Sequence, residues 1–344
     1  MQPQFRIVAD GNDITTLINQ RLLLLRTSDK PGMQSDDFEL RIDARDGALA
    51  LPSRGALIEV HLGYGGQPLT RLGRFTVDEV ELSGPPDTLV IRGKASDLCG
   101  SGKTTRSGSW EALPLQRIVS EIAARNGWQA VCPLTVLVAR VDQYAESDLA
   151  FITRLARLYD CTAKLANGQL LVLPRQAGKS ASGKPLGVVT LDRSMVSKWQ
   201  FRLDDQQTHK AVRTRHQDPA SGALQVVELA NSAVTPGDQP VHTDRHVYPN
   251  RAAAEQAARA RLASFNRGTA SLRLEMAGRT DLFAERSIET SGFCAGLDGL
   301  YLIDSVEQLF TNSGWQTTVH CNGGSQGKSN NKGVAPRRGT AIKV

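Results

Sequence analysis

Apolar and polar residues alternate along several short stretches near the start of this 344-residue chain. In "FELRID" (38–43) three apolar residues alternate with three charged ones, and "LIEVHLGY" (57–64) continues the pattern. A period of two buries one face of a β-strand and leaves the other face in water. Turn sequences rich in Gly, Asp and Pro separate such stretches. Residues 1–100 are therefore predicted to form a first, small antiparallel β-barrel.

The stretch "RFTVDEVEL" (74–82) breaks this alternation in one place. Phe75 and Val77 share one phase, whereas Val80 and Leu82 share the other. A shift by one residue moves side chains to the opposite face unless the strand takes up an extra residue. We therefore expect a β-bulge at Asp78–Glu79.

Residues 101–176 change to a helical period and are predicted to form a small α/β module. "LPLQRIVSEIAARNG" (113–127) indicates a helix with Pro114 in its first turn and Asn126-Gly127 as its stop signal. The next helical stretch, "ESDLAFITRLARLYD", begins at residue 146. Ser147 or Asp148 is expected to cap that second helix.

The module is expected to end in a β-hairpin, "CTAKLANGQLLVLP" (161–174). Its centre, Asn167-Gly168, suits a type I′ turn, in which both residues take positive φ angles. A polar connector rich in Gly and Ser follows, over residues 176–185. The module is thus predicted to be a separate unit followed by a linker.

Residues 177–320 are predicted to form a second β-barrel. Alternating stretches return there, and "NRAAAEQAARARLASFNRG" (250–268) interrupts them with one alanine-rich helix. We place this inserted helix at 250–266, with Asn250 as its cap and Gly268 as its stop. The expected fold is mainly β with α+β parts, in which two barrels flank the module.

Residues 321–344 are expected to be a disordered basic tail. They contain five Lys or Arg residues and no acid, whereas the whole chain has a net charge of +6. Removing the five cations of the tail leaves +1 for the rest, so the folded body is nearly neutral. Few large apolar side chains are present in the tail, and burial could not offset the entropy of ordering it. We expect it to become ordered only against a partner.

The stretch "GSGKTT" (100–105) is similar to a phosphate-binding loop. Such a loop needs a glycine five residues before Gly102 and a helix starting directly after the lysine. Asp97 occupies the glycine position, and Ser107-Gly108-Ser109 follows where the helix should begin. We therefore expect a solvated crossover loop rather than a nucleotide site, with Lys103→Ala leaving function intact.

Other candidate sites are weak. His242 and His246 have the spacing of helical metal ligands, but Pro249 places them in an expected loop. Glu146 and Asp148 could form a carboxylate pair, although acids at a helix start usually interact with the helix dipole. We assign no catalytic, cofactor-binding or metal-binding residue.

Cysteine usage and hydropathy add two expectations. The five cysteines are Cys99, Cys132, Cys161, Cys294 and Cys321. They are scattered and odd in number, which favours reduced thiols. No secretion leader is recognised at the start, and "RLLLLR" is too short to span a bilayer. We expect no membrane insertion and no nucleic-acid recognition.

Several stretches resemble one protein family. "GRFTVDEVELSGPPDTLVIRGKASD" (73–97), "TTRSGSWEALPLQRIVSEIAARNG" (104–127), "AESDLAFITRLA" (145–156) and "LYLIDSVEQLFTNSGWQTTVH" (300–320) are similar to the late control protein D family of contractile-tailed phages. An R-type pyocin, a headless phage-tail bacteriocin, carries a similar protein. The resemblance covers nearly residues 1–320, with Ala145 as one departure where a polar residue is expected.

The resemblance implies a structural baseplate hub without enzymatic activity. Three copies are expected to form a ring of six barrels that joins the six-fold tail tube to the three-fold central spike. Other baseplate and tape-measure components are further expected partners. The middle module is expected to be similar to LysM domains. The protein would assemble in the bacterial cytoplasm and then remain in the baseplate of the released particle.

Two alternatives from other functional classes stay open at this stage. A cell-wall-binding module would bind peptidoglycan, and a nucleotide-binding enzyme would be stabilised by its ligand. A hub should instead form a trimer without any small molecule. The sequence does not distinguish a phage from a bacteriocin.

Overall fold

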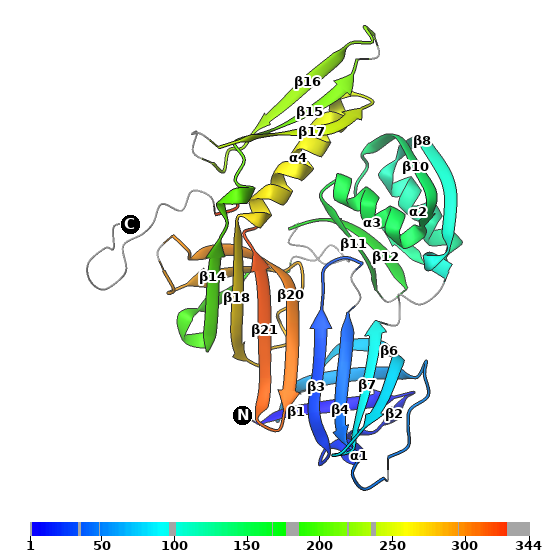
Figure 1. The fold of residues 1–344 in the computed structure, drawn as a ribbon, viewed down its shortest axis with the longest axis vertical. Helices are drawn as coiled ribbons and strands as arrows, with labels where there is room; N and C mark the ends of the chain where they lie inside the picture. Colours follow the sequence, from blue (N-terminus) through cyan, green and yellow to red (C-terminus); the bar gives the residue numbers. More distant parts are fainter. Residues whose placement is uncertain are drawn as a thin grey trace, which may run out of the picture.

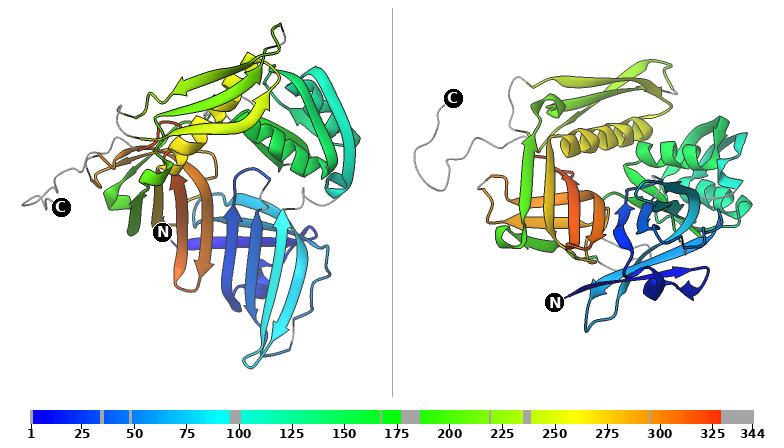
Figure 2. Two further views of the ribbon diagram at one scale, coloured as in Figure 1. Left: turned by 45° about the horizontal axis from the view of Figure 1, so that its top comes forward. Right: turned by 60° about the horizontal axis from the view of Figure 1, so that its bottom comes forward.

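The computed structural model describes residues 2–33, 36–47, 49–95, 101–166, 168–176, 186–218, 220–234, 239–294 and 296–328. Two β units stand side by side and form the body of the molecule (Figure 1). Two smaller α/β units, the module and an insertion, lie at one end of the body (Figures 1 and 2). The predicted mainly β fold is confirmed.

The first unit contains strands β1 to β7 and one short helix. Its elements are β1 (Pro3–Ala9), β2 (Asn12–Asp13), α1 (Thr15–Ile18), β3 (Leu22–Asp29), β4 (Asp37–Asp43), β5 (Leu57–Tyr64), β6 (Thr70–Ser83) and β7 (Thr88–Ala95). The alternation predicted for β4 and β5 is confirmed by their buried apolar residues. The predicted bulge is confirmed too, because the register of β6 against β7 shifts between Val77 and Glu79.

The second unit is built from strands before and after the insertion. Its elements are β13 (Val189–Asp192), η3 (Arg193–Met195), β14 (Lys198–Leu203), β18 (Ala270–Ala277), β19 (Ser287–Ser291), β20 (Gly299–Thr311) and β21 (Gly314–Asn322). Most neighbours are antiparallel, and β13 pairs in parallel with β19. Long-range pairing therefore assembles this unit from distant parts of the chain.

A single sheet passes through both units. Its strand order is β14-β18-β21-β20-β3-β4-β7-β6-β5-β1-β2, with β19 and β13 branching from β20. The crossing point is the antiparallel pair of β20 with β3, from Val306 opposite Asp29 to Thr311 opposite Leu24. The strands from β14 to β6 stand upright beside one another in Figure 1. The division into two closed barrels stays a prediction, since the described strands form one sheet.

Each unit nevertheless has an apolar core. In the first core, Leu25, Leu40 and Val60 are completely buried. In the second core, Leu274 and Tyr301 are completely buried. Two separate cores explain why the alternation of the sequence pointed to two β units.

The module carries both predicted helices and the predicted hairpin. Its elements are η2 (Ser101–Lys103), β8 (Thr105–Pro114), α2 (Leu115–Arg125), β9 (Gln129–Val131), β10 (Leu137–Ser147), α3 (Asp148–Leu158), β11 (Cys161–Ala166) and β12 (Gln169–Pro174). Strands β8 and β10 pair with each other but were not predicted. Most of their side chains are exposed, so they lack an apolar pattern. The likeness to LysM domains stays a prediction.

The predicted helix ends of the module are partly confirmed. Ser147 caps α3, because its Oγ accepts a hydrogen bond from the Ala150 N–H at 3.2 Å. Helix α2 ends at Arg125, with Asn126 as its C-cap residue, and Gly127 has a φ of +74°. Pro114 was wrongly placed in the first turn, since it precedes α2 as its cap residue in extended conformation. In the hairpin turn Gly168 has a φ of +72°, while Asn167 lies outside the described residues.

The insertion differs from the prediction that residues 177–320 form one second β-barrel. It consists of η4 (Asp205–Gln207), β15 (Ala211–Gln217), β16 (Leu224–Ala230), β17 (Val241–Tyr248) and α4 (Arg251–Gly268). Its strands form a separate sheet in the order β16-β15-β17 and do not belong to a second barrel. Helix α4 covers this sheet through Ala258 and Leu262, which pack on Val212. The cap is confirmed, since the Asn250 side chain accepts a hydrogen bond from the Ala253 N–H.

The predicted start of the disordered tail is also wrong. Strand β21 continues to Asn322, and Cys321 within it is 2% exposed. The Gly323 N–H donates to the Arg267 carbonyl, and the Lys328 N–H donates to Thr269 Oγ1 at 2.8 Å. These residues lack apolar side chains, but the end of α4 provides acceptors for their backbone. Residues 329–344 lie outside the described residues.

Candidate functional site

The similarity to a phosphate-binding loop reflects packing. Asp97 lies outside the described residues, and Thr105 begins strand β8 where a phosphate loop needs a helix. Gly102 is buried, and a Cβ atom there would come within 2.4 Å of the Trp128 ring. The solvated loop predicted for this glycine is therefore wrong. The element that directly follows Lys103 is a strand, so the loop lacks the helix that a phosphate-binding loop needs after its lysine.

The two candidate metal ligands, His242 and His246, lie on strand β17 and not in the predicted loop. Four residues along a strand separate two side chains by roughly 13 Å, too far for one metal ion. The His242 ring packs on Phe265, with ring centroids 4.9 Å apart. Burial and the nearby Arg261 lower the pKa of His242. Among the described residues, no group of three or more His, Cys, Asp or Glu could hold a metal ion.

The candidate carboxylate pair has two separate structural roles. Asp148 has no exposed side-chain surface and accepts hydrogen bonds from Arg125, Asn126 and Gln143. Burial alone would raise the pKa of Asp148, but these donors lower it. Glu146 instead pairs with an arginine of α3. The ionised Asp148 therefore anchors the start of α3 to the end of α2.

Three of the four thiols that the structure describes are poor nucleophiles. Cys132, Cys161 and Cys321 are buried, and no disulfide joins the described cysteines. Burial raises the pKa of Cys161 to about 12, so its thiol stays protonated at neutral pH. Cys99 lies outside the described residues. No helix among those described is long and apolar enough to cross a membrane.

The upright strands have one face that turns away from both cores, and we call it the open face. Its side chains alternate along each strand with those of the cores. The charged and polar members include Arg26, Ser28, Glu39, Arg41, Glu79, Glu81, Arg92, Lys198, Gln200, Arg202, Arg273, Glu275, Glu307, Gln316, Thr318 and His320. This surface extends across both units because the sheet does.

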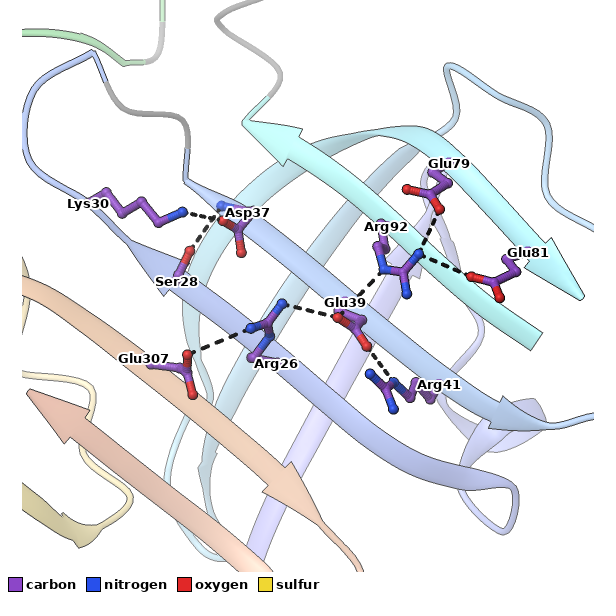
Figure 3. A network of polar contacts seen from close by, with 10 residues as sticks. All are labelled: Arg26, Ser28, Lys30, Asp37, Glu39, Arg41, Glu79, Glu81, Arg92 and Glu307. Carbon is purple, nitrogen blue, oxygen red and sulfur yellow. Dashed lines mark hydrogen bonds and ion pairs between the residues drawn. The ribbon is translucent and has the colours of Figure 1, made fainter. Parts of the chain in front are cut away.

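Ion pairs cross the open face from strand to strand (Figure 3). Arg26 lies 3.8 Å from Glu307 and 3.0 Å from Glu39, which joins the second unit to the first. Arg92 continues the row, 3.6 Å from Glu39, 2.6 Å from Glu79 and 3.2 Å from Glu81. With Arg41, which also contacts Glu39, these residues form the charged strip: Arg26, Glu39, Arg41, Glu79, Glu81, Arg92 and Glu307.

Glu39 is the centre of the charged strip. Its side chain is 6% exposed. Burial alone would raise its pKa, but Arg41, Arg26 and Arg92 surround the carboxylate and lower it. Because the strip contains three arginines and four glutamates, its charges nearly cancel. A surface of this kind attracts neither polyanions nor polycations strongly.

The two β units meet at what we call the sheet joint. It consists of the β3–β20 pair and of two aromatic contacts beneath it. The rings of Phe5 and Phe310 lie 5.2 Å apart, and those of Tyr64 and Trp315 lie 5.1 Å apart. Phe310 and Trp315 belong to the second unit but complete the core of the first. Backbone pairing and apolar burial thus join the two halves.

The module meets the rest of the chain at what we call the ionic joint. Lys164 Nζ lies 2.8 Å from Asp29 and 3.2 Å from Asp36 of the first unit. The Thr162 hydroxyl donates to Glu285 of the second unit at 2.8 Å. In addition, Asp160 pairs with Arg267 at the end of α4. The module therefore contacts three other parts of the molecule through polar groups, and Met33 of the first unit also packs against its apolar core.

A groove of about 540 Å³ separates the module from the insertion. Its lining includes six arginines and two aspartates, a set that suggests an anion site. Four of the arginines already have acidic partners: Arg140 with Asp142, Arg154 with Glu146, Arg261 with Asp244 and Arg267 with Asp160. Most of the positive charge is therefore compensated, and the groove carries no assigned function.

Comparison with known proteins identifies the family. Residues 33–314 match the family described as phage tail baseplate hub (GPD). The chain belongs to the phage tail baseplate hub family. It is also 30% identical to the "Probable baseplate hub protein" of Escherichia phage P2, over 93% of this chain and 92% of that protein. The family resemblance drawn from the sequence is confirmed, and the chain is a component of a phage-type baseplate.

Solved structures support the fold. The tail protein from Neisseria meningitidis MC58 has a TM-score of 0.70 at 14% identity, covering 96% of this chain and 99% of that one. The E. coli c3393 protein, a component of the type VI secretion system, has a TM-score of 0.57 at 12% identity, covering 93% and 76%. The β-rich body of this hub thus occurs in phage tail proteins and in a type VI component.

The charged strip was not predicted from the sequence. Glu39 and Arg41 were visible in "FELRID" as the polar half of an alternating strand. Their partner Arg92 comes from another strand, and no local pattern connects it to them. The sequence did show that the solvent-facing positions of several alternating strands are charged, and this was the signal that could have indicated the strip.

Proposed function

We propose that three copies of this hub form a ring that joins a six-fold tail tube to a three-fold central spike. The observation that carries the proposal is that one chain contains two β units within one sheet. Strands β14-β18-β21-β20 belong to the second unit and β3-β4-β7-β6 to the first, so each unit contributes four upright strands. Three chains would present six four-stranded units to the six-fold tube. The same three chains would present three identical surfaces to the three-fold spike. A ring of single-unit chains could not match both symmetries.

We further propose that the hub acts as a scaffold without catalysis, cofactor or metal. The residues considered as candidates for chemistry serve as structural contacts, as with Asp148 beneath α3 and Gly102 against Trp128. The open face is the proposed lining of the central channel. Its nearly compensated charges would let other tail components pass without strong attraction.

The module would lie at the periphery of this ring. It has an apolar core of its own around Ile118, Phe151 and Leu170, and polar contacts connect it to the body. The central spike, the tail tube and the tape-measure protein are the proposed partners. Assembly would take place in the bacterial cytoplasm, before the hub becomes part of the baseplate of a phage or bacteriocin particle.

Electron microscopy of the assembled tail tests the proposal. We expect three hub chains in one ring, with the upright strands of both units around the channel. The module should lie outside this ring. Six chains per ring, or upright strands from only one unit around the channel, would overturn the proposal.

A further inference from the structure

The upright part of the sheet ends in two open edges. β6 pairs with β5 through Thr70–Thr76 and with β7 through Phe75–Ser83, so one edge of β6 pairs with no described strand from Glu79 to Ser83. At the opposite end, β14 pairs with β18, and its other edge has no partner strand among the described residues. Open edges present N–H and C=O groups that a further strand can pair with.

We propose that these two edges form one interface, in which β14 of one chain pairs with β6 of the next copy. This inference rests on the ring proposed above and names the surfaces that would close it. The interface joins two different surfaces, so repetition by rotation closes a ring and leaves no edge free. The sheet would then continue from chain to chain around the channel.

The directions of the strands fit this interface. Every pair along β14-β18-β21-β20-β3-β4-β7-β6 is antiparallel, and the row contains eight strands. β14 and β6 therefore run in opposite directions. A rotation about an axis along the strands brings β14 of the next copy beside β6 as another antiparallel neighbour, which keeps the hydrogen-bonding pattern of the sheet.

The charges of the two edges are complementary. Glu79 and Glu81 on β6 share one arginine, Arg92, which also contacts Glu39. That edge is left with excess negative charge. On β14, no ion pair joins the exposed Arg202 to any described residue. Opposite charges on two surfaces favour their correct pairing and disfavour the pairing of like edges.

The other face of each edge is apolar and exposed in the single chain. Leu82 on β6 is 59% exposed, and Trp199 on β14 is 41% exposed. An open edge that exposes large apolar side chains tends to pair with a strand of another chain. Pairing would bury these side chains and extend the two apolar cores toward each other.

The alternation of both strands selects the register. Placing Arg202 opposite Glu79 in an antiparallel pair aligns the apolar phases of the two strands. The remaining pairs are Val80 with Phe201, Glu81 with Gln200, Leu82 with Trp199 and Ser83 with Lys198. A slip by one residue would place apolar side chains of one strand beside charged side chains of the other.

A charge exchange tests the interface in the full chain. We expect light scattering to give the mass of three chains for the wild type and loss of that species for Arg202→Glu or Glu79→Arg. The double variant, Arg202→Glu with Glu79→Arg, should regain the trimer. Arg245→Glu is the matched control, because Arg245 is an exposed strand arginine on the insertion. Circular dichroism verifies that each variant is folded.

Cysteine cross-linking tests the register. In a chain carrying both Gln200→Cys and Glu81→Cys, the new thiols lie at opposite ends of one row of strands and can meet only between copies. Residues opposite each other in an antiparallel pair are about 4.5–5.5 Å apart at Cβ. We expect covalent dimers and trimers on a non-reducing gel. Gln200→Cys with Arg41→Cys, whose second site lies in the centre of the open face, should give none.

The outcomes distinguish a failure of the β14–β6 pairing from a failure of the proposed ring. A wild-type trimer that tolerates both charge reversals and gives no cross-link would overturn the edge pairing and leave the trimer intact. A wild-type chain that stays monomeric in solution and is not present in three copies in the tail would overturn the ring and the edge pairing together.

Discussion

The sheet joint and the ionic joint connect parts of the same chain by different physical means. At the sheet joint, β3 pairs with β20 and Trp315 enters the core of the other unit. At the ionic joint, Lys164 reaches two aspartates of the first unit while the module keeps its own core. The first joint merges two units into one body. The second positions a unit that is otherwise complete.

The energies of the two joints should therefore respond to different perturbations. Apolar burial changes little with pH, and its loss leaves a cavity. A partly buried ion pair contributes little net stability when intact, but removing one partner leaves a charge without compensation. The following variants separate these two behaviours.

The largest loss of stability is expected at the sheet joint. Trp315 is 7% exposed, packs on Tyr64 and donates a hydrogen bond from its indole N–H to Gln308. Trp315→Ala should lower the free energy of unfolding by about 3–5 kcal/mol. Urea denaturation followed by circular dichroism measures this loss. Tyr144→Ala, at a residue that is 85% exposed, is the control. An equal loss in both variants would argue against an apolar joint.

A smaller loss is expected at the ionic joint. Lys164→Met removes the cation between Asp29 and Asp36. We expect a loss of about 2 kcal/mol, below the range for a fully buried pair, because the Lys164 side chain is 29% exposed. Hydrogen exchange should increase at the contacts of the module, while the β3–β20 amides keep their protection. Lys94→Met breaks an exposed pair with Asp78 as the control. Faster exchange across β3–β20 would contradict independent joints.

The internal stability of the module can be changed without altering the charges at its joint. Gly168 has a φ of +72° in the hairpin that carries Lys164. Gly168→Val should destabilise the module by roughly 1–2 kcal/mol, because a β-branched residue is strained there. Gly108→Ala is the matched control, since a Cβ atom there meets only ordinary contacts with Trp110. Equal melting temperatures for the two variants would show that the hairpin turn tolerates the larger side chain.

The smallest effect concerns pH. Burial raises the pKa of Glu285, although Arg175 and Thr162 partly oppose the shift. The contribution of this group to stability is complete below its unfolded pKa, about 4.3, and is lost as pH rises through the folded value. Glu285→Gln should therefore flatten the fall in stability that the wild type shows as pH rises above about 4.3. Urea unfolding of both proteins at each pH measures the difference. A steeper fall in the variant would reverse the assigned sign.

Elements with a strong local period were predicted correctly from the sequence. The alternation in β4 and β5 and the helical spacing in α2 and α3 depend only on neighbouring residues. β8 was missed because its side chains are mostly exposed, so burial leaves no pattern in its sequence. The stretch after Asn322 was misjudged for a different reason, since its backbone bonds to α4 rather than burying side chains.

The sequence by itself determined the family, the mainly β class and the position of those strands and helices that have a strong local period. Only the tertiary structure decided that β3 pairs with β20, that Glu39 lies among three arginines, and that β6 and β14 keep open edges. The physical reason is that alternation specifies which face of a strand is buried but not which strand lies beside it. Neighbours in this sheet come from opposite ends of the chain, and only the packing of complete units selects among them.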